Sequence, residues 1–435
     1  MKLLLTGARV IDPSQQMDVA ADVLLENGKI TKIAPALLKT LNSKDQGKMK
    51  TIDLSGKIVV PGLIDMHTHL REPGLEYKET IASGGAAAVA GGFTSVACMP
   101  NSSPINDNRS ITEFIKRKAA EAALANVYPI GAISKDSAGF QLTEFWDLKE
   151  AGIVALSDDG KPVMDAALMR RALEYASSLG LPVISHCEDI NLSGGGLMNE
   201  GYYSTILGLR GSPSIAEEAM VARDILIAEF TKTSVHIAHV STAGSVRLIR
   251  EAKKRGLKIT AETAPHYFTL TDESMQSYDT NFKVNPPLRS PDDLAAIKEG
   301  LADGTLDAIA CDHAPHGRTD KEVEFEYASC GISGLETSLG LSLQLIHDGV
   351  LALPELIAKM STNPARILNL PKGTLKAGAD GDITVIDPQL KWTVDVKAFR
   401  SRGKNSPFHG RQMRGRAVLT IVGGDIKFAL PSLKL

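Results

Sequence analysis

The middle of the chain, from about Val59 to Leu370, alternates short β-rich runs with helical stretches. Amphipathic stretches such as Asp165–Leu179, Ser214–Thr231 and Ala243–Arg255 separate runs that have the composition of buried strands. Eight strand-then-helix units predict an α/β fold of the closed (β/α)8 TIM-barrel type, with its functional site at the C-terminal ends of the strands. The predicted strands are Gly62–His69, Phe93–Met99, Asn126–Ile133, Ile153–Ser157, Pro182–Cys187, Ser234–Val240, Leu257–Thr263 and Leu306–Asp312.

The two ends of the chain instead show short strand-like runs with turns. Neither end has enough apolar residues for a core of its own, so we expect them to pair in one small β-sandwich domain. The predicted domains are residues 1–58 and 373–435 for this β domain, and residues 59–372 for the barrel. The predicted strands of the ends are Leu3–Val10, Ala21–Glu26, Lys29–Ile33, Asp382–Ile386, Ala417–Val422 and Lys427–Leu430.

Composition excludes several classes of protein. The 435 residues suit a large barrel with a smaller attached domain. The net charge of -3 includes no basic excess for nucleic acid, and no stretch of about 18 apolar residues predicts a membrane span. The apolar run at the N-terminus is too short for a signal peptide. Four cysteines without paired spacing favour a reduced, cytoplasmic compartment.

Histidine and aspartate gather where the predicted strands end. The first strand ends in Asp65-Met-His67-Thr-His69, and residues two apart on a strand share a face, so both imidazoles can point into the barrel mouth. Two unpaired histidines on a buried parallel strand would cost burial energy. An isolated His-x-His pair is weak evidence for a metal, and its position at a strand end strengthens that evidence.

Four further predicted strands end in similar residues. The fifth carries His186, and the eighth ends in Cys311-Asp312-His313-Ala-Pro-His316. The fourth ends in Ser157-Asp158-Asp159-Gly160. The sixth carries His236 and His239, which are three apart and are therefore expected on opposite faces; we favour His239, nearest the rim, as the inward one.

Each of these residues also has a purely structural explanation. A single histidine at a strand end is more often a hydrogen-bonded core residue, and an aspartate after a strand is more often a helix N-cap. Asp158 and Asp159 could simply terminate their strand before Gly160. Five strands that carry histidine or aspartate at one rim are hard to obtain from independent caps, however. Four imidazoles and two carboxylates suit Zn²⁺, or a pair of divalent ions.

A metal site of this kind favours hydrolysis of an amide. A divalent ion lowers the pKa of bound water toward about 7 and polarises a carbonyl oxygen. Hydrolysis of a cyclic amide also needs a proton carrier to the leaving nitrogen, and Asp312 on the last strand is our candidate. The alternative is that Asp312 is a metal ligand without a role in proton transfer.

Three further polar residues suggest a substrate class. Arg71 follows the histidine pair by two residues and offers a bidentate partner for a carboxylate, unless it forms a surface ion pair with Glu72 or Glu76. Asn101 and Asn285 could contact a ureido or imide edge, although each also suits a turn. The residues therefore favour an anionic, amide-bearing small molecule.

The motif His67-Thr-His69-Leu-Arg71-Glu-Pro-Gly74 resembles the signature of the dihydroorotase family, in its bacterial monofunctional class. The resemblance extends over essentially the whole chain. It continues through Met99-Pro-Asn101-Ser-Ser-Pro104, Ser157-Asp-Asp-Gly160, His186-Cys-Glu, His239-Val-Ser-Thr, Pro265-His-Tyr-Phe, Asn285-Pro-Pro-Leu-Arg289, Asp312-His-Ala-Pro-His316, Gly331-Ile-Ser-Gly-Leu-Glu-Thr337 and Asn405-Ser-Pro-Phe-His-Gly410.

This resemblance implies a zinc-dependent cyclic amide hydrolase that reversibly closes N-carbamoyl-L-aspartate to L-dihydroorotate and water, a step of pyrimidine biosynthesis. It implies a metal-bound hydroxide as nucleophile and Asp312 as general acid/base and shared ligand. One metal would lie on His67 and His69, and a second on His186 and His239.

The resemblance also implies a bridging ligand and substrate contacts. Many relatives bridge their metals with a carbamylated lysine on strand four, but no lysine stands in Ile153–Asp159. We therefore expect Asp159 as the bridge, with Asp158 as the fallback. The implied substrate contacts are Arg71, Asn101, Asn285, His316 and the backbone of Cys330 and Gly331.

Two other functions compete with this one. A dihydropyrimidinase or allantoinase would share the fold and metals, but usually keeps the strand-four lysine and lacks the context of Arg71. A catalytically inactive partner of aspartate carbamoyltransferase would lack metal ligands, which are all present here.

The sequence leaves open whether one or two zinc ions bind, whether a homodimer forms and whether the active enzyme joins that transferase. It also leaves open whether the charged segment Pro315–Ser329 is a mobile lid or a solvated surface, and we favour the surface.

Overall fold

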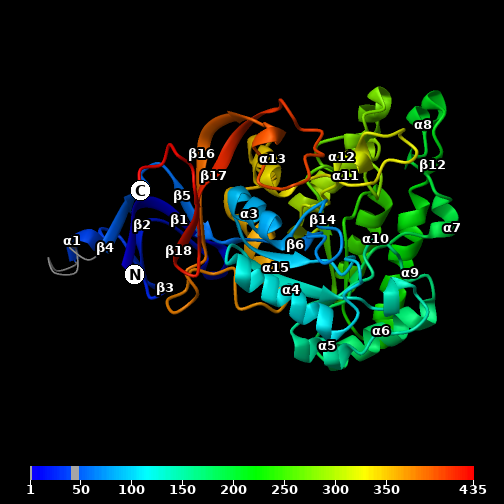
Figure 1. Cartoon of the computed structure of the whole chain (residues 1–435), viewed down its shortest axis with the longest axis horizontal. Helices are drawn as coiled ribbons and strands as arrows, with labels where there is room; N and C mark the ends of the chain where they lie inside the picture. Colours follow the sequence, from blue (N-terminus) through cyan, green and yellow to red (C-terminus); the bar gives the residue numbers. More distant parts are fainter. Residues whose placement is uncertain (1, 41–48) are drawn as a thin grey trace.

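The computed structural model describes residues 2–40 and 49–435, which form a barrel with a separate sheet at one end (Figure 1). Eight parallel strands form two hydrogen-bonded groups of four, and isolated bridges from Leu156 to Val183 and from Thr68 to His313 close the ring. The predicted (β/α)8 barrel is therefore confirmed, with one strand in each predicted range. The strands are β6 (Leu63–Thr68), β7 (Phe93–Cys98), β8 (Asn126–Gly131), β9 (Ala155–Leu156), β10 (Ile184–Ser185), β13 (Val235–Ile237), β14 (Ile259–Thr263) and β15 (Ala308–Ile309).

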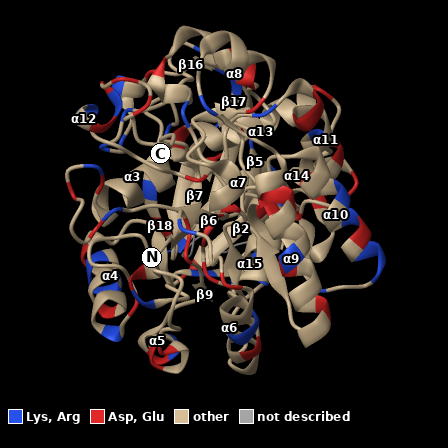
Figure 2. Cartoon of the chain, turned by 90° about the vertical axis from the view of Figure 1, so that its right-hand side faces the viewer, with Lys and Arg blue, Asp and Glu red and all other residues tan. Residues whose placement is uncertain are grey.

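Helices surround these strands, as Figure 2 shows for α3, α4, α6, α9 and α10 around β6, β7 and β9. The three helices predicted by range are confirmed as α6, α9 and α10, with ends within one residue. The Asp165 carboxylate caps α6 by accepting hydrogen bonds from the N–H groups of Ala167 and Leu168. The longer helices are α3 (Ile81–Gly91), α4 (Arg109–Ala122), α5 (Phe145–Ala151), α6 (Ala166–Ser178), α9 (Ile215–Thr231), α10 (Ala243–Lys254), α11 (Pro291–Ala302) and α13 (Leu335–His347).

Several barrel strands are shorter than predicted. The predicted range Ile153–Ser157 contains only β9, and Pro182–Cys187 contains only β10. Pro182 has no N–H with which to join a ladder, and neighbouring strands of a barrel are staggered, so their hydrogen-bonded overlap is short. The residues that follow these short strands lie outside the strand pairing, so their backbone can turn toward the barrel mouth.

The predicted β domain from both chain ends is confirmed as one eight-stranded sheet in the order β18-β17-β16-β5-β1-β2-β3, with β4 also paired to β1. The two ends meet where β5 runs antiparallel to β16. The strands are β1 (Lys2–Asp12), β2 (Met17–Glu26), β3 (Lys29–Ala34), β4 (Met49–Asp53), β5 (Ile58–Pro61), β16 (Ile383–Thr393), β17 (Gln412–Val422) and β18 (Asp425–Ala429). The exact domain ranges stay a prediction.

The sheet packs closely against the barrel. The Thr384 hydroxyl donates to the Gly92 carbonyl, and the Thr420 hydroxyl donates to the Val89 carbonyl at the end of α3. Gly92 has a φ of +96°, and a Cβ added there would lie 2.8 Å from the Ala417 Cβ, so this approach requires glycine. The small domain is therefore fixed to the barrel along α3.

Short elements lie in the loops and after α13, namely α1 (Leu37–Thr40), α7 (Ile190–Ser193), β11 (Met198–Asn199), α8 (Tyr202–Leu207), β12 (Gly211–Ser212), α12 (Arg318–Lys321), α14 (Leu353–Ile357) and α15 (Asn363–Ile367). Acidic and basic residues are mixed on the outer helices, for example on α4 and α10 (Figure 2). Among the described residues, no helix has the length and apolar character of a membrane span.

Candidate metal centre

Asp159 lies at the centre of a cluster of four imidazoles in the barrel mouth. Its Oδ1 is 3.3 Å from His67 Nε2, 3.5 Å from His186 Nδ1 and 3.4 Å from His239 Nε2, and its Oδ2 is 3.5 Å from His69 Nε2. These residues follow β9, β6, β10 and β13, or lie at their ends. Asp159 is thus the carboxylate that reaches both predicted metal positions.

Asp312 completes the cluster from the end of β15. Its Oδ1 is 2.9 Å from His69 Nε2 and 3.5 Å from His67 Nε2. All the predicted metal ligands are buried, and Asp312, at 8% exposure, is the most accessible of them. Two overlapping sets of donor atoms are each close enough to hold an ion, and both include His67: one joins it to Asp159 and His239, the other to His69 and Asp312.

The backbone turns sharply at several of these residues. His239 has a φ of 32°, Asp312 of 47° and Arg71 of 63°, all in the left-handed region that non-glycine residues seldom occupy. Such conformations cost about 1–3 kcal/mol each and cluster at functional sites. They direct His239 and Asp312 into the mouth after the strand ladders have ended.

Asp158, the fallback for the bridge, has other partners. Its carboxylate accepts hydrogen bonds from the N–H groups of Ile133 and Ser134 and from the Ser134 hydroxyl. It therefore fixes the turn after β8, while Asp159 faces the imidazoles.

A second layer of polar side chains orients the imidazoles. Glu262 Oε1 lies 2.6 Å from His67 Nδ1, and Asn101 Oδ1 lies 2.8 Å from His69 Nδ1. Glu188 Oε2 lies 3.1 Å from His186 Nε2. A partner of this kind fixes the tautomer and the direction of the ring nitrogen that faces a metal.

The electrostatics of the cluster favour positive charge at its centre. Burial opposes the charged imidazolium, but the carboxylates of Asp159 and Asp312 outweigh it and raise the pKa of His67 well above its usual value. In the same way, burial opposes the charged carboxylates, but the imidazoles around them lower the pKa of Asp159 and that of Asp312. A cation, either a proton or a metal ion, is therefore needed between these groups.

Two buried atoms show where a metal would fit. Within residues 2–40 and 49–435, no hydrogen-bond partner satisfies His67 Nε2 or Asp159 Oδ1, which lie 3.3 Å apart. A nitrogen lone pair and a carboxylate oxygen that face each other in a buried site are ordinary ligands of a divalent ion. The residues present therefore fit a metal centre.

Comparison with known proteins agrees with this chemistry. A family described as Dihydro-orotase-like matches residues 56–245, and the Amidohydrolase family matches residues 216–428. The dihydroorotase of Syntrophus aciditrophicus (strain SB) is 62% identical over 428 residues, which cover 98% of this chain and 99% of that protein. The chain belongs to the dihydroorotase family. The dihydroorotase of Pelotomaculum thermopropionicum is 58% identical, over 98% of each chain.

Solved structures of hydantoinases and dihydropyrimidinases have the same fold as this chain. The L-hydantoinase (dihydropyrimidinase) of Arthrobacter aurescens superposes with a TM-score of 0.87 at 25% identity, and covers 100% of this chain and 97% of its own. The dihydropyrimidinase of Brevibacillus agri NCHU1002 gives 0.86 at 23% identity, over 100% and 96% of the two chains. These structures share the fold, and the dihydroorotase relatives with the Amidohydrolase family match show that the chain is a cyclic amide hydrolase, as the sequence predicted.

Arg71 lies at the same mouth as the metal ligands of this dihydroorotase-family chain. Its Nε donates to the Pro315 carbonyl at 3.3 Å, and its Nη2 is 3.4 Å from His316 Nε2. Within the described residues it pairs with no carboxylate, since Glu72 accepts from the Ile81 N–H and Glu76 from the Gly74 N–H. A partly buried guanidinium without a counter-ion is a receptor for an anion.

The other predicted substrate contacts have partners in the protein. The His316 ring lies 2.8 Å from the Cys330 carbonyl and 3.2 Å from Lys78 Nζ. Asn285 Nδ2 donates to Glu188, and Asn101 uses its oxygen on His69, which leaves its amide N–H₂. These residues surround the mouth and fix one another.

The backbone of Gly331, like the Cys330 carbonyl, is engaged within the protein. Its N–H donates to the Lys283 carbonyl, and its carbonyl accepts from Asn405 Nδ2. A Cβ added at Gly331 would lie 2.5 Å from the Ala314 Cβ and 2.8 Å from the Ala314 carbonyl oxygen. Glycine is thus needed at position 331 to leave room for Ala314, and the predicted backbone contacts of Cys330 and Gly331 with substrate stay predictions.

Sequence reasoning missed Glu188, Glu262 and His266. An acidic residue inside a buried parallel strand such as β14 was a signal for Glu262, since such a charge needs a partner. His266 belongs to the motif Pro265-His-Tyr-Phe; burial lowers the pKa of its imidazole to about 4, and its Nε2 has no hydrogen-bond partner among the described residues. A neutral imidazole whose Nε2 has no partner among the described residues is available to a ligand.

Proposed function

We propose that this chain catalyses the reversible ring closure of N-carbamoyl-L-aspartate to L-dihydroorotate and water. The observation that supports this most directly is the unpaired Arg71 guanidinium beside a metal-type cluster in a chain of the dihydroorotase family. An anionic substrate with a cyclic amide is what such a pair of features recognises. The reaction would serve pyrimidine biosynthesis in the cytoplasm, a reducing compartment in which the four free cysteines would stay as thiols.

We assign the metal ligands by their positions in the cluster. His67 and His69 would hold one Zn²⁺, His186 and His239 a second, and Asp159 would bridge the two. A bound divalent ion supplies a nucleophile from water at neutral pH and polarises the amide carbonyl. One or two ions per chain are compatible with this donor set.

Asp312 is our proposed general acid/base. The lowered pKa of Asp312 keeps its carboxylate ionised at neutral pH, so that it can accept a proton. Its Oδ1 contacts His69, and no described residue donates a hydrogen bond to its Oδ2. That free oxygen, at the most exposed ligand of the cluster, is available to take a proton and pass it to the leaving nitrogen.

Arg71 would bind the carboxylate of the substrate, assisted by His316. Burial of the His316 ring, together with the neighbouring cations Arg71 and Lys78, lowers the pKa of His316 to about 2, so this ring is neutral. Lys78 donates to Nδ1, which leaves an N–H on Nε2 that donates to the Cys330 carbonyl. Asn101 and Asn285 complete the polar wall that would meet the ureido edge.

The alternative functions are less well supported. The four imidazoles and both carboxylates converge, which argues against an inactive chain. A neutral ring would leave the Arg71 guanidinium unpaired, which argues against a dihydropyrimidinase or allantoinase. A homodimer and a complex with aspartate carbamoyltransferase stay predictions that sedimentation of the pure protein, alone and with that transferase, would test.

A substrate panel tests the proposal. We expect the zinc-loaded protein to hydrolyse L-dihydroorotate in preference to hydantoin, dihydrouracil and allantoin. Arg71→Met should lower kcat/KM for dihydroorotate by about 30- to 1000-fold, because truncating one partner of a buried charge pair costs about 2–4 kcal/mol. Asp312→Ala should abolish turnover while substrate still binds. A clear preference of the wild type for a neutral ring would overturn the assignment.

A further inference from the structure

A line of buried polar side chains in contact leads from the metal centre down through the barrel. His67 Nδ1 is 2.6 Å from Glu262 Oε1, and Glu262 Oε2 is 3.3 Å from His236 Nε2. His236 Nδ1 is in turn 2.8 Å from the Thr260 hydroxyl. His67, Glu262 and His236 are at most 2% exposed. Glu262 and His236 have no part in the function proposed above.

The donors along this line fix each ring in one orientation. A carboxylate only accepts hydrogen bonds, so Glu262 Oε1 requires an N–H on His67 Nδ1. The second oxygen, Oε2, faces His236 Nε2 at 3.3 Å, an ion-pair distance at which the two atoms make no hydrogen bond. The Thr260 hydroxyl can donate to His236 Nδ1, which directs the His236 Nε2 edge toward Glu262. The lone pair of His67 then lies on Nε2, the atom that faces Asp159 and Asp312.

We propose that Glu262 and His236 are positioning residues that together hold His67 in its metal-binding orientation. The negative charge of Glu262 makes the His67 ring nitrogen a stronger ligand for a cation, and the His236 ring faces the second oxygen of that buried carboxylate at ion-pair distance. The inference rests on the proposed function only in taking His67 as a metal ligand. We call Glu262 and His236, with the Thr260 hydroxyl, the relay. The proposal gives the relay a role in metal affinity, not in contact with substrate.

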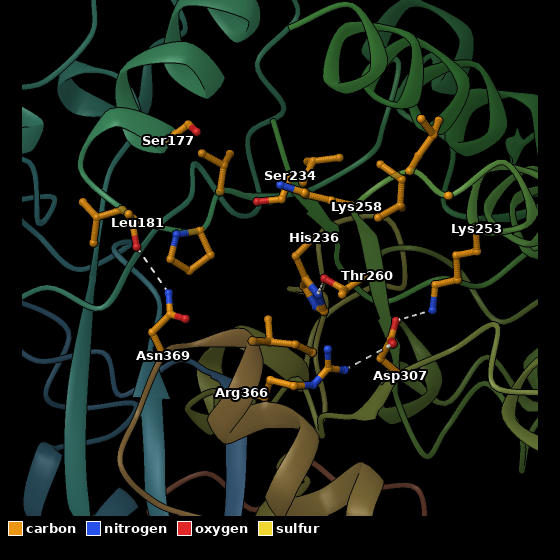
Figure 3. A pocket seen from close by; sticks show the side chains of 18 residues that line it. Ser177, Leu181, Ser234, His236, Lys253, Lys258, Thr260, Asp307, Arg366 and Asn369 are labelled. Carbon is orange, nitrogen blue, oxygen red and sulfur yellow. Dashed lines mark hydrogen bonds and ion pairs between the residues drawn. The ribbon is translucent and has the colours of Figure 1, made fainter. Parts of the chain in front are cut away.

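The relay ends at a cavity on the opposite side of the barrel from the metal centre. This cavity of about 620 Å³ is lined by residues that precede or begin strands, among them Val183, Ser234, His236 and Leu257. Figure 3 shows the His236 ring at the cavity with its bond to Thr260. Removal of the His236 side chain would therefore open a space that a small molecule can enter from solvent.

The first test compares zinc affinities by competition with a chelator. Glu262→Gln keeps the shape and one acceptor but removes the charge, and we expect zinc binding about 10- to 100-fold weaker. Glu217→Gln is the matched control, because Glu217 is also buried but accepts from Ser241 and Thr242 in place of a metal-ligand imidazole. Its zinc affinity should equal that of the wild type. Zinc affinity within twofold of wild type in Glu262→Gln would overturn the proposal.

The second test uses imidazole as a replacement ring. We expect His236→Ala to release zinc to a chelator faster than the wild type, and added imidazole to slow that release. Imidazole can also bind zinc directly, so the wild type with added imidazole is the control, and slower release confined to His236→Ala reports imidazole in the cavity. A wild-type release rate in His236→Ala, or a faster rate that imidazole does not slow, would exclude the relay. Because zinc is the readout, failure of dihydroorotate turnover would contradict the proposed function and leave this test valid.

Discussion

Two adjacent aspartates, Asp158 and Asp159, make opposite contacts, and each predicts a different mutant phenotype. Asp159 reaches four imidazoles, so Asp159→Asn should lose bound zinc and lower turnover by about 100-fold or more. Asp158→Asn should keep its zinc but lose about 1–3 kcal/mol of stability, because the Ile133 and Ser134 N–H groups lose a charged acceptor. Metal content by elemental analysis and the free energy of unfolding by denaturant distinguish the two. Zinc loss in Asp158→Asn with normal zinc in Asp159→Asn would reverse our assignment of the bridge.

His316 predicts how stability depends on pH. Its pKa is about 2 in the folded chain, against an ordinary 6.5, so between these values the unfolded chain binds a proton that the folded chain does not. Wild-type stability should therefore fall as pH drops below 6.5, by up to about 1.4 kcal/mol per pH unit from this residue. His316→Gln should remove that component, so that the difference in unfolding free energy between variant and wild type shifts in favour of the variant from pH 7 to pH 5. A constant difference over this range would contradict the neutral state of His316.

At the residue scale, the metal ligands could be predicted from their positions at the ends of strands. The side chains that orient those ligands could not be predicted in this way. His67, His186 and Asp312 were predictable because parallel strands end at one rim. The choice of Asp159 over Asp158 rested on resemblance, since one residue of register decides which carboxylate turns inward. Glu188 and Glu262 meet their imidazoles only through tertiary contacts with other strands, which periodicity does not describe.

At the scale of elements, two buried lysines hold the charged segment after β15. Lys283 Nζ donates to the carbonyls of Phe325 and Glu326, and Lys321 Nζ to that of Ser329. Lys283→Met should leave its two carbonyls unpaired at a cost of about 1.5–3 kcal/mol, which corresponds to more than tenfold faster amide hydrogen exchange in residues 317–329. Lys298→Met, which removes only a surface pair with Asp348, is the control and should leave that exchange unchanged. Unaltered exchange in Lys283→Met would show that other contacts fix the segment.

The limits of a strand decide which side chains face inward, and sequence places those limits poorly. Strict alternation put His236 and His239 on opposite faces, yet both lie inside the barrel. The ladder of β13 ends at Ile237, and the left-handed φ at His239 turns its side chain back toward the mouth. Alternation holds only within a regular strand. His236 was excluded from the predicted ligands because alternation allows only one of the two histidines to face inward. Since β13 ends at Ile237, alternation does not extend to His239, and this reason does not apply.

At the scale of the whole molecule, the pairing of the chain ends was predictable and its extent was not. Two apolar-poor ends that could not fold alone had to share a core. β4 and β5 were not predicted. In the case of β5, Ile58–Pro61, the four-residue apolar run could equally be interpreted as the start of the first barrel strand. The sheet and barrel meet through β5, since β6 begins two residues after it ends.

This continuity predicts that the sheet and the barrel unfold together. Ile383 is fully buried in β16 and pairs with Pro61, so Ile383→Ala should cost about 2–5 kcal/mol. Because Thr384 and Thr420 bond the sheet to α3, we expect one calorimetric transition, shifted to lower temperature as a whole and still accompanied by zinc release. Ile297→Ala, at a fully buried site in the barrel helix α11, should shift the same single transition. Two transitions, of which Ile383→Ala moves only the one without zinc release, would mean that the sheet folds as an independent unit.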